Sequence, residues 1–504
     1  MVPSRVVGLA AVAAVAVACG GSGSDSGDAG CGLAVGGPGW ILEGASARIP
    51  IACANGEVPQ GLTVAGLPDA ARWDAEAGVV AWTPSLSDAG MYQIEASLPG
   101  GELARGRVGV VEAWDADGNQ PPDPARYTEE YGLPVVHLEH AQAVSASYEV
   151  PATLTYRGET YQITVKYRGS RSLSFPKKSY TLAFPDTKRF SDPTLGIEGR
   201  KKMALVTTFD DQTHVRDRLA LELWKRLAPG RFGVKKASAV LYVNGAFRGH
   251  YVLSEKLGGQ VLASARLNGD GNLYQGKTHA ANFAATLPDG TPKETWHDGY
   301  EKDEGTPVQG EPGAFDDLDA FVEHVATSDD ATFAARLPGM ADVDEYRDWW
   351  VLVMLASAGD SAGKNGILYH DPRGGPWRTT VWDWGVSFGQ DWRTYRTTPR
   401  DGWDFAGANR LFRRLLAPPF GDGTRARLAA AVEERVPAAA VLALYDAMVA
   451  ETAEVARRDD ARWGAAQRAF FGAEGRTDWG SPESERAYAR RWIQDRWAFL
   501  ADAY

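Results

Sequence analysis

The hydrophobic pattern of this 504-residue chain changes period partway along, and that change limits the folds open to it. Residues 152–156, 161–167 and 179–184 alternate apolar and polar side chains, which predicts strands of an antiparallel sheet. From residue 314 onward, apolar residues recur mostly at helical spacing. The pattern therefore predicts an α+β domain in which a β-rich part precedes a helical part, within a chain long enough for two or three domains.

The expected helices have recognisable ends. Those after residue 314 cover residues 315–326, 344–356, 424–435, 441–457 and 481–500. The last opens with Ser481 and Pro482, a hydroxyl cap followed by proline at the first helical position. An earlier amphipathic helix over 211–227 begins at an acidic cap. A hairpin is expected over 239–253, turning at Asn244-Gly245.

The N-terminal segment is a targeting signal. Arg5 supplies the positive region, and residues 6–18 form an apolar run too short to span a bilayer. Residues 16–19 resemble a bacterial lipobox, so we expect residues 1–19 to be a lipoprotein signal peptide and Cys19 to be lipidated. The alternative is an ordinary secretory cleavage site beside an incidental cysteine. Residues 20–30, rich in Gly and Ser, then form a flexible tether.

A small all-β domain is expected over residues 31–113. In an exported protein, Cys31 and Cys53 are most simply interpreted as a disulfide. Residues 47–51 and 106–111 alternate like strands. The Asp88-x-Gly-x-Tyr92 element resembles a tyrosine corner, in which the phenol caps a loop, and the segment as a whole resembles the immunoglobulin-like sandwiches of bacterial surface proteins. Spacing, or adhesion to a surface protein or glycan, is its expected role.

A linker is expected over residues 114–130. Its Asp-x-Asp-Gly-Asn run resembles part of a calcium loop but has no glutamate at the twelfth position. Turn chemistry in a proline-stiffened linker is the better interpretation.

The stretch of sequence from Asp360 to Asp383 contains candidate catalytic and metal-binding residues. Asp360 precedes Asn365 by five residues, the spacing by which a catalytic loop offers a carboxylate to a substrate hydroxyl and an amide oxygen to a metal. A hairpin-like segment follows, and then Asp383-Trp384-Gly385, which has the form of a D-F-G metal site. The alternative is that these Asp, Asn and Gly residues only form turns.

The charge distribution narrows the ligand classes. The net charge of −12 argues against a general nucleic-acid binder. Against that background, residues 166–202 carry ten Lys or Arg and only three Asp or Glu. A solvated face would explain such a run. A polyphosphate ligand would explain it as well, since its charge needs cations nearby.

Several blocks together resemble the CotH family of spore-coat protein kinases. They are F-P-K-K-S-Y at 175–180, V-N-G-x-x-x-G-x-Y at 243–251 and the K-N…W-D-W…S-F-G run from Lys364. The resemblance covers residues 131–504. It implies a two-lobed, atypical protein-kinase-like domain that uses ATP with Mg²⁺ or Mn²⁺.

The resemblance also implies roles for individual residues in the β-rich part. Lys177 or Lys178 would grip the nucleotide phosphates, with support from Arg168. Glu222, on the following helix, would hold that lysine, unless it is an exposed helix charge. The segment around Glu255 would meet the adenine.

In the helical part, Asp360 would orient or deprotonate the acceptor hydroxyl, while Asn365 and Asp383 hold the metal. The family usually has Asp-x-Asp where this chain has Asp383-Trp384-Gly385, so one carboxylate is missing. The leading hypothesis is an exported kinase acting on Ser or Thr hydroxyls of surface proteins, including itself. The alternative is a catalytically silent surface-binding lipoprotein whose only membrane contact is its lipid anchor.

Overall fold

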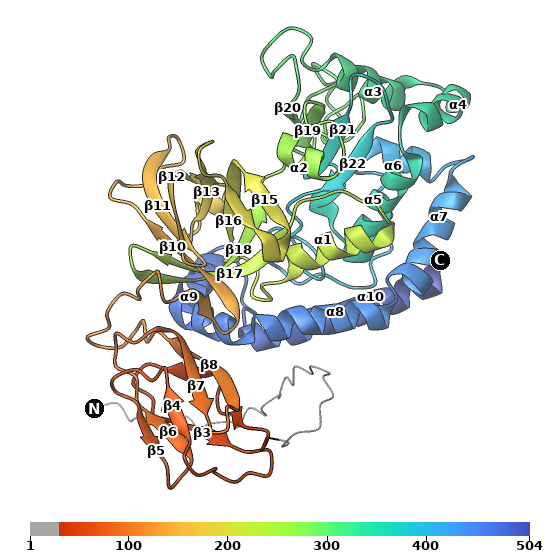
Figure 1. The fold of residues 1–504 in the computed structure, drawn as a ribbon. Coiled ribbons are helices and arrows are strands. Elements are labelled where there is room, and N and C mark those ends of the chain that lie inside the picture. The colour runs from red at the N-terminus through yellow and green to blue at the C-terminus, as the bar shows by residue number, and fades with distance from the viewer. Residues whose placement is uncertain (1–29) are drawn as a thin grey trace. The chain divides into compact units, whose positions relative to one another are not determined.

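The computed structural model describes residues 30–504, which form two compact units (Figure 1). The predicted signal peptide, lipidation at Cys19 and nearly all of the tether lie outside the described residues. The first unit comprises residues 30–138 together with Thr155–Thr160 and Tyr242–Phe247. The second comprises Glu139–Leu154, Tyr161–Leu241 and Arg248–Tyr504. Helices and strands are both abundant, so the predicted α+β class is confirmed.

Two four-stranded sheets enclose the core of the first unit. One has the order β1-β3-β6-β5 and the other β2-β8-β7-β4. Their buried side chains, among them Ile49, Trp82, Ile94 and Val110, form one hydrophobic cluster. The strands are β1 (Ala34–Val35), β2 (Trp40–Leu42), β3 (Ala47–Ala52), β4 (Thr63–Ala65), β5 (Arg72–Asp74), β6 (Val79–Trp82), β7 (Gly90–Ser97) and β8 (Leu103–Val111), followed by the β9 (Glu129–Glu130) and β10 (Leu133–Glu139) pair.

Two predicted local features of the first unit are confirmed. Cys31 and Cys53 form a disulfide with their Cα atoms 5.1 Å apart. The Tyr92 hydroxyl donates a hydrogen bond of 2.7 Å to the carbonyl of Asp88, which is the expected tyrosine corner. Both features link separate parts of the chain within this unit.

Most of the strands that open the second unit are antiparallel and follow the sheet order β11-β12-β13-β16-β18-β17, while the β11–β12 and β17–β18 turns, Thr155–Thr160 and Tyr242–Phe247, are counted with the first unit. These are β11 (Val150–Tyr156), β12 (Glu159–Arg168), β13 (Ser179–Ala183), β16 (Lys202–Thr207), β17 (Lys236–Val243) and β18 (Ala246–Glu255), with β14 (Phe190–Asp192) and β15 (Ile197–Arg200) as a separate pair. The predicted hairpin is confirmed: Asn244 and Gly245 turn the chain with φ of 50° and 73°, values that suit Asn and Gly in a tight turn. A second sheet of order β20-β19-β21-β22 contains β19 (Asn272–Gly276), β20 (Tyr300–Glu304), β21 (Gly366–His370) and β22 (Arg378–Val381).

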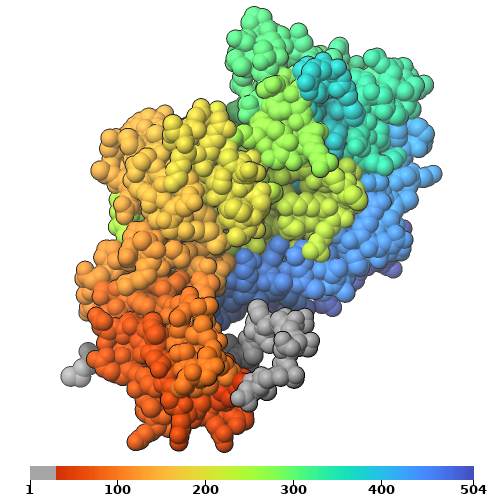
Figure 2. Space-filling model, in the orientation of Figure 1, coloured from red at the N-terminus to blue at the C-terminus, as the bar shows by residue number. Residues whose placement is uncertain are grey.

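Helices supply the rest of the second unit. They are α1 (Arg216–Leu227), α2 (Gly259–Ser264), α3 (Asp316–Thr327), α4 (Asp330–Met340), α5 (Val343–Ala356), α6 (Arg410–Leu415), α7 (Gly421–Ala430), α8 (Ala438–Glu451), α9 (Ala453–Ala473) and α10 (Pro482–Ala503). Every residue of α5 from Asp348 to Ala356 is buried, so this helix is the centre of the large hydrophobic core. Within this unit, yellow-green residues around α1 and blue residues of the later helices lie side by side (Figure 2). Every described helix is too short or too polar for a membrane span.

Helix boundaries differ from prediction in three places. The helix expected over 211–227 with an acidic cap begins only at Arg216, and its N-cap residue, Val215, makes no side-chain cap hydrogen bond, so the predicted start and cap are wrong. The helix expected over 441–457 is interrupted at Thr452, whose hydroxyl donates to the Met448 carbonyl at 3.1 Å and so competes with the helical ladder. The helix expected over 424–435 is α7 followed by a π-helical turn, Ala431–Arg435. The predicted cap of α10 is confirmed, since the Ser481 hydroxyl accepts from the Ser484 amide.

Candidate functional site

The β21–β22 hairpin brings the two ends of the predicted motif together. Gly366 at the start of β21 pairs with Val381 at the end of β22, so Asn365 and Asp383 lie at the same end of the hairpin. The Asn365 amide nitrogen donates to the main-chain carbonyl of Asp383 at 3.2 Å. Both residues have left-handed backbones, with φ of 62° and 58°. Such conformations are tolerated best by Asn and Asp, and here they direct two polar side chains to one place.

Asp383 carries a carboxylate with no direct partner among the described residues. Its carboxyl pKa is raised, first by burial and then by repulsion from Asp217, while Arg168 and Lys236 act in the opposite direction. The residue nevertheless keeps exposed surface. A carboxylate that is partly dehydrated, unpaired and still accessible is suited to bind a cation.

Asp360 lies in a 3₁₀ turn, Gly359–Ser361, just beyond α5. The Lys364 ammonium donates to both of its carboxylate oxygens at 3.0 and 2.9 Å, and His279 Nε2 lies 3.2 Å away. Burial alone would raise the pKa of Asp360, but these two partners hold it below its usual value. Asn365 also donates weakly to it, at 3.4 Å. Asp360, Asn365 and Asp383 therefore form one connected group.

A second connected group stands behind Asp383. Asp217, in the first turn of α1, accepts from the Trp384 amide at 2.9 Å and from the Lys236 ammonium at 2.6 Å. The same lysine lies 5.1 Å from the Trp382 ring centroid, and the Arg168 guanidinium lies 5.8 Å from it. Asp217 and Lys236 thus fix the main chain on the C-terminal side of Asp383. Arg168 lies near enough to Asp383 to lower its pKa, and phosphate support by Arg168 stays a prediction.

The carboxyl group of Asp210 is close enough to Asp383 for the two charges to interact. The pKa of Asp210 is raised to about 7, chiefly by burial and then by the charges of Asp211 and Asp383, while Arg171 acts in the opposite direction. The candidate site therefore gathers negative charge from three separate segments of the chain.

Positive charge gathers beside it. Arg168 ends β12, Lys202 begins β16 and Lys277 follows β19, and all three lie close enough to Lys256 to lower its pKa. Loss of surrounding water is the larger cause of that shift, and Asp303 opposes it. Four cations that repel one another are suited to share an anionic ligand.

The prediction that Lys177 grips nucleotide phosphates is wrong. Its side chain is fully buried, and its ammonium donates to the His250 carbonyl at 2.7 Å and forms an ion pair with Asp459 of α9. Gly249 permits this approach, because a Cβ there would lie 2.0 Å from an Asp459 oxygen. Lys177 is a structural residue.

The predicted pairing of Glu222 with Lys177 or Lys178 is wrong as well. Glu222 pairs with Lys225 one turn away on α1, and Lys178 donates to the Leu173 carbonyl at 2.6 Å. The pair that does join α1 to the sheet is Asp217–Lys236. A phosphate contact by Lys178 stays a prediction.

The carboxylate of Glu255 is also engaged elsewhere. It accepts from Arg200 at 2.6 Å and from the Lys235 amide at 2.7 Å, and the residue is 1% exposed. The Glu255 carboxylate is therefore not free to bind adenine, and an adenine contact by the rest of the segment around Glu255 stays a prediction. The exposed neighbour Lys256 is the residue of this segment that faces outward.

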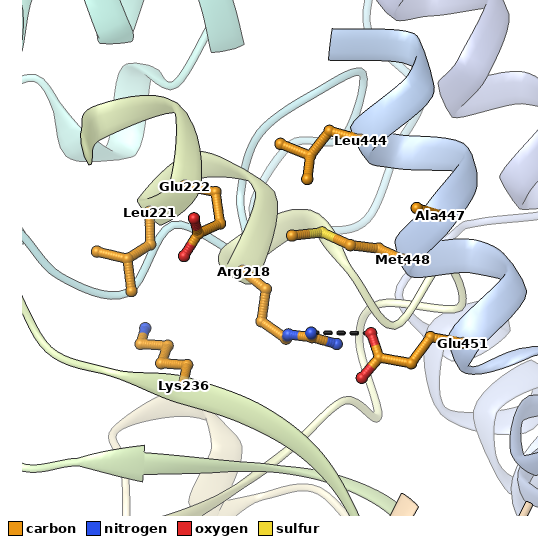
Figure 3. Close-up of a pocket in the computed structure, with 8 residues that line it drawn as sticks. All are labelled: Arg218, Leu221, Glu222, Lys236, Leu444, Ala447, Met448 and Glu451. Carbon is orange, nitrogen blue, oxygen red and sulfur yellow. Dashed lines mark hydrogen bonds and ion pairs between the residues drawn. The ribbon is translucent and has the colours of Figure 1, made fainter. Parts of the chain in front are cut away.

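A cavity of about 260 Å³ lies on the side of α1 that faces α8 (Figure 3). Arg218 and Glu451 form an ion pair of 2.9 Å across it, and Lys236 reaches it from the neighbouring strand (Figure 3). Its lining is Arg218, Leu221, Glu222, Lys236, Leu444, Ala447, Met448 and Glu451. Neither Asp360 nor Asp383 borders it, and Lys236 is the lining residue that it shares with the candidate active site.

Asp383 and Asn365 can supply two oxygen ligands to a metal ion whose other ligands come from a bound substrate and water. Within residues 30–504, no group of three or more His, Cys, Asp or Glu side chains could bind a metal ion by itself. Asp383 offers a free carboxylate, and Asn365 uses only its nitrogen in hydrogen bonds, leaving its oxygen available. Mg²⁺ commonly takes one or two such protein oxygens and completes its shell with water and substrate phosphates.

Sequence reasoning missed Asp217, Lys236, His279 and Lys364 as members of the site. Lys364 had a usable signal, because it adjoins Asn365 and follows Asp360 by four residues. Asp217 and Lys236 had none, since their pairing depends on how α1 packs beside β17.

These features define an α+β protein with an Asp–Asn–Asp site at the end of a hairpin and a cationic cluster beside it. The family model described as CotH kinase protein matches residues 165–500, and the chain belongs to that family. It is also similar to the inner spore coat protein H of Bacillus subtilis (strain 168). The two are 27% identical over 270 residues, which is 53% of this chain and 70% of that protein.

Proposed function

We propose that this protein is an Mg²⁺- and ATP-dependent kinase that phosphorylates Ser or Thr hydroxyls of surface proteins, including its own. The observation that carries the proposal is the convergence of Asp360, Asn365 and Asp383 at one end of the β21–β22 hairpin. Family membership supports the same class of reaction. The sheet of the second unit with α1 would serve as the small lobe of a kinase, and the later helices as the large lobe.

Asp383 and Asn365 would hold the metal through the carboxylate and the amide oxygen. Bound Mg²⁺ with ATP would supply the transferable phosphoryl group and neutralise part of its charge. Arg168, Lys202 and Lys256 would offset the remaining phosphate charge from the side of the sheet. This cluster would do the work of a glycine-rich loop, a motif that the sequence lacks.

Asp360 would accept a hydrogen bond from the acceptor hydroxyl and orient it for transfer. Because its pKa is depressed, the group is a carboxylate at neutral pH, as an acceptor must be. Lys364 and His279 fix its direction from two sides. Lys364 also places a positive charge where a phosphoryl group would develop negative charge.

The purified chain with labelled ATP, Mg²⁺ or Mn²⁺ and a generic protein acceptor provides the test. We expect transfer in the wild type and a fall of roughly 10²- to 10⁴-fold in Asp360→Asn, the scale of losing a positioned acid–base group. Nucleotide-dependent stabilisation should persist in that variant, because Asp360 is not a proposed metal ligand. Lys225→Gln, on the solvent side of α1, is the control.

A surface-binding protein without catalysis is the second candidate, and Gly385 is the observation that favours it. Absence of both transfer and nucleotide-dependent stabilisation in the wild type would support this candidate. A shift in melting temperature without transfer would indicate a nucleotide-binding protein that has lost the reaction.

We further propose export and anchoring through a lipid on Cys19, from the signal-like composition of residues 1–19. Cys19→Ser should then yield an unprocessed or soluble form that no longer partitions into detergent. Unchanged partition would overturn the anchor.

A further inference from the structure

Arg496 is a buried cation whose hydrogen bonds all go to main-chain carbonyls. It lies on α10 and is 0% exposed. Its guanidinium donates to the Met354 carbonyl from Nε at 2.9 Å and from Nη2 at 2.7 Å. Nη1 donates to the carbonyls of Pro399, at 3.2 Å, and Asp401. A single side chain therefore joins two segments far apart in sequence.

The first segment leads directly to Asp360. Met354 lies in the last turn of α5, where carbonyls have no partner within the helix. The guanidinium satisfies this carbonyl and places positive charge at the negative end of the helix dipole. The chain then reverses at Ser357, whose φ is 49°, and reaches Asp360 three residues later.

The second segment packs against the same turn. From Pro399 and Asp401 the chain continues to Trp403 and to Phe405, whose ring is buried. A Cβ built on Gly359 would lie 3.3 Å from the Phe405 ring and 3.7 Å from Trp403. Both aromatic residues thus lie beside the residue that precedes Asp360.

We propose that Arg496 is a positioning residue that holds the Asp360 turn between these two segments, an inference that rests on the proposed function. Its action is indirect, because no atom of Arg496 contacts the site side chains. Three carbonyls in fixed directions need the fork of a guanidinium, and a lysine ammonium cannot reach all of them. Small misplacement of a reacting group costs rate more than it costs binding.

The test compares Arg496→Lys with Arg490→Lys, a control on the same helix whose residue is exposed and pairs with Asp446. Both are assayed well below their melting temperatures. Arg496→Lys should lower kcat by about tenfold or more while KM for ATP changes little. Arg490→Lys should leave both unchanged. Phe405→Leu, which loosens the second segment alone, should reproduce the same pattern, and it replaces Arg496→Lys if that variant does not fold.

Hydrogen exchange gives a measurement that needs no activity. Amides of residues 358–362 should exchange faster in Arg496→Lys, while those of β12 and β13 should not change. Such local acceleration would support the positioning role even if the wild type transfers no phosphate, a result that would overturn only the proposed function. Unchanged kcat together with unchanged exchange in residues 358–362 would overturn the inference, as would acceleration throughout the chain.

Discussion

The Asn365 amide donates to the Asp383 carbonyl at 3.2 Å while the Asp383 carboxylate itself has no partner in the described chain. The main chain is thus held and the functional group is left free. Burial and Asp217 both disfavour the charged form of that group. This arrangement gives up stability for function, as binding sites commonly do.

Asp383→Asn should separate stability from function. The amide keeps the shape, suits the left-handed backbone and removes an unpaired charge, so the melting temperature should be equal or higher. Mg²⁺-dependent nucleotide binding should weaken, and transfer should fall by at least about 10²-fold. Thermal unfolding with and without Mg-ATP measures both effects. A variant that is less stable yet still fully active would show that Asp383 only forms a turn.

Lys236→Met tests the Asp217–Lys236 ion pair, which joins α1 to the sheet in place of the predicted pair between Glu222 and Lys177 or Lys178. Loss of the ammonium would leave Asp217 unpaired close to Asp383, so we expect transfer to fall by about 10- to 100-fold, or about 1.4–2.8 kcal/mol. Glu222→Gln, on the same helix, should change stability by no more than about 0.5 kcal/mol and leave transfer intact. If Glu222→Gln lowered transfer and Lys236→Met did not, Glu222 and not Lys236 would belong to the site.

The sequence predicts contacts that arise within short segments. The hairpin joining Asn365 to Asp383, the turn at Asn244-Gly245 and the corner at Tyr92 each depend on residues close in the chain. Apolar spacing likewise finds α5, because a helix buried on all sides needs apolar residues on every face.

Long-range pairing is where prediction fails. Lys177 and Asp459 are 282 residues apart, and the helix that carries Asp459 extends well beyond the predicted one. A lysine beside a strand looks the same in sequence whether it meets a ligand or a distant carboxylate. Packing decides between the two.

Lys177→Met should therefore act on stability and not on nucleotide affinity. It removes the ammonium that pairs with the buried Asp459 carboxylate, and breaking a buried ion pair in this way typically costs about 3–5 kcal/mol. Lys178→Met, at the adjacent position, should cost far less. Urea unfolding measures the stability of both variants, and the ATP affinity of folded Lys177→Met should match the wild type. Weaker ATP binding by a stable Lys177→Met would return this residue to the nucleotide site.

His250 should make stability depend on pH. Its pKa lies well below 6.5, chiefly through burial and then through the positive charges of His214, Lys177, Arg218 and Arg486, so the folded protein keeps it neutral. The unfolded chain takes up this proton below pH 6.5, so acid favours unfolding through this group.

The measurement compares wild type with His250→Gln, whose amide can still reach Thr208 and Ser238. The stability difference between the two should shift in favour of the variant as pH falls from 7 to 5, by up to about 1.4 kcal/mol per pH unit. Parallel stability profiles over this interval would contradict the assignment.

Gly385→Asp tests whether a second carboxylate, which the resemblance described in the sequence analysis leads us to expect here, would assist Asp383. A Cβ at residue 385 meets no atom within 4 Å, and its backbone is not left-handed, so the variant should fold normally. Gly389→Asp is the contrasting control, because its φ is 91° and its Cβ would lie 2.8 Å from Trp492. If the missing carboxylate limits catalysis, Gly385→Asp should preserve or raise phosphoryl transfer, and a lower concentration of Mn²⁺ should give half-maximal transfer. A folded variant with lower transfer would mean that added negative charge beside Asp383 and Asp217 hinders the site, and that one carboxylate at this turn is what the site requires.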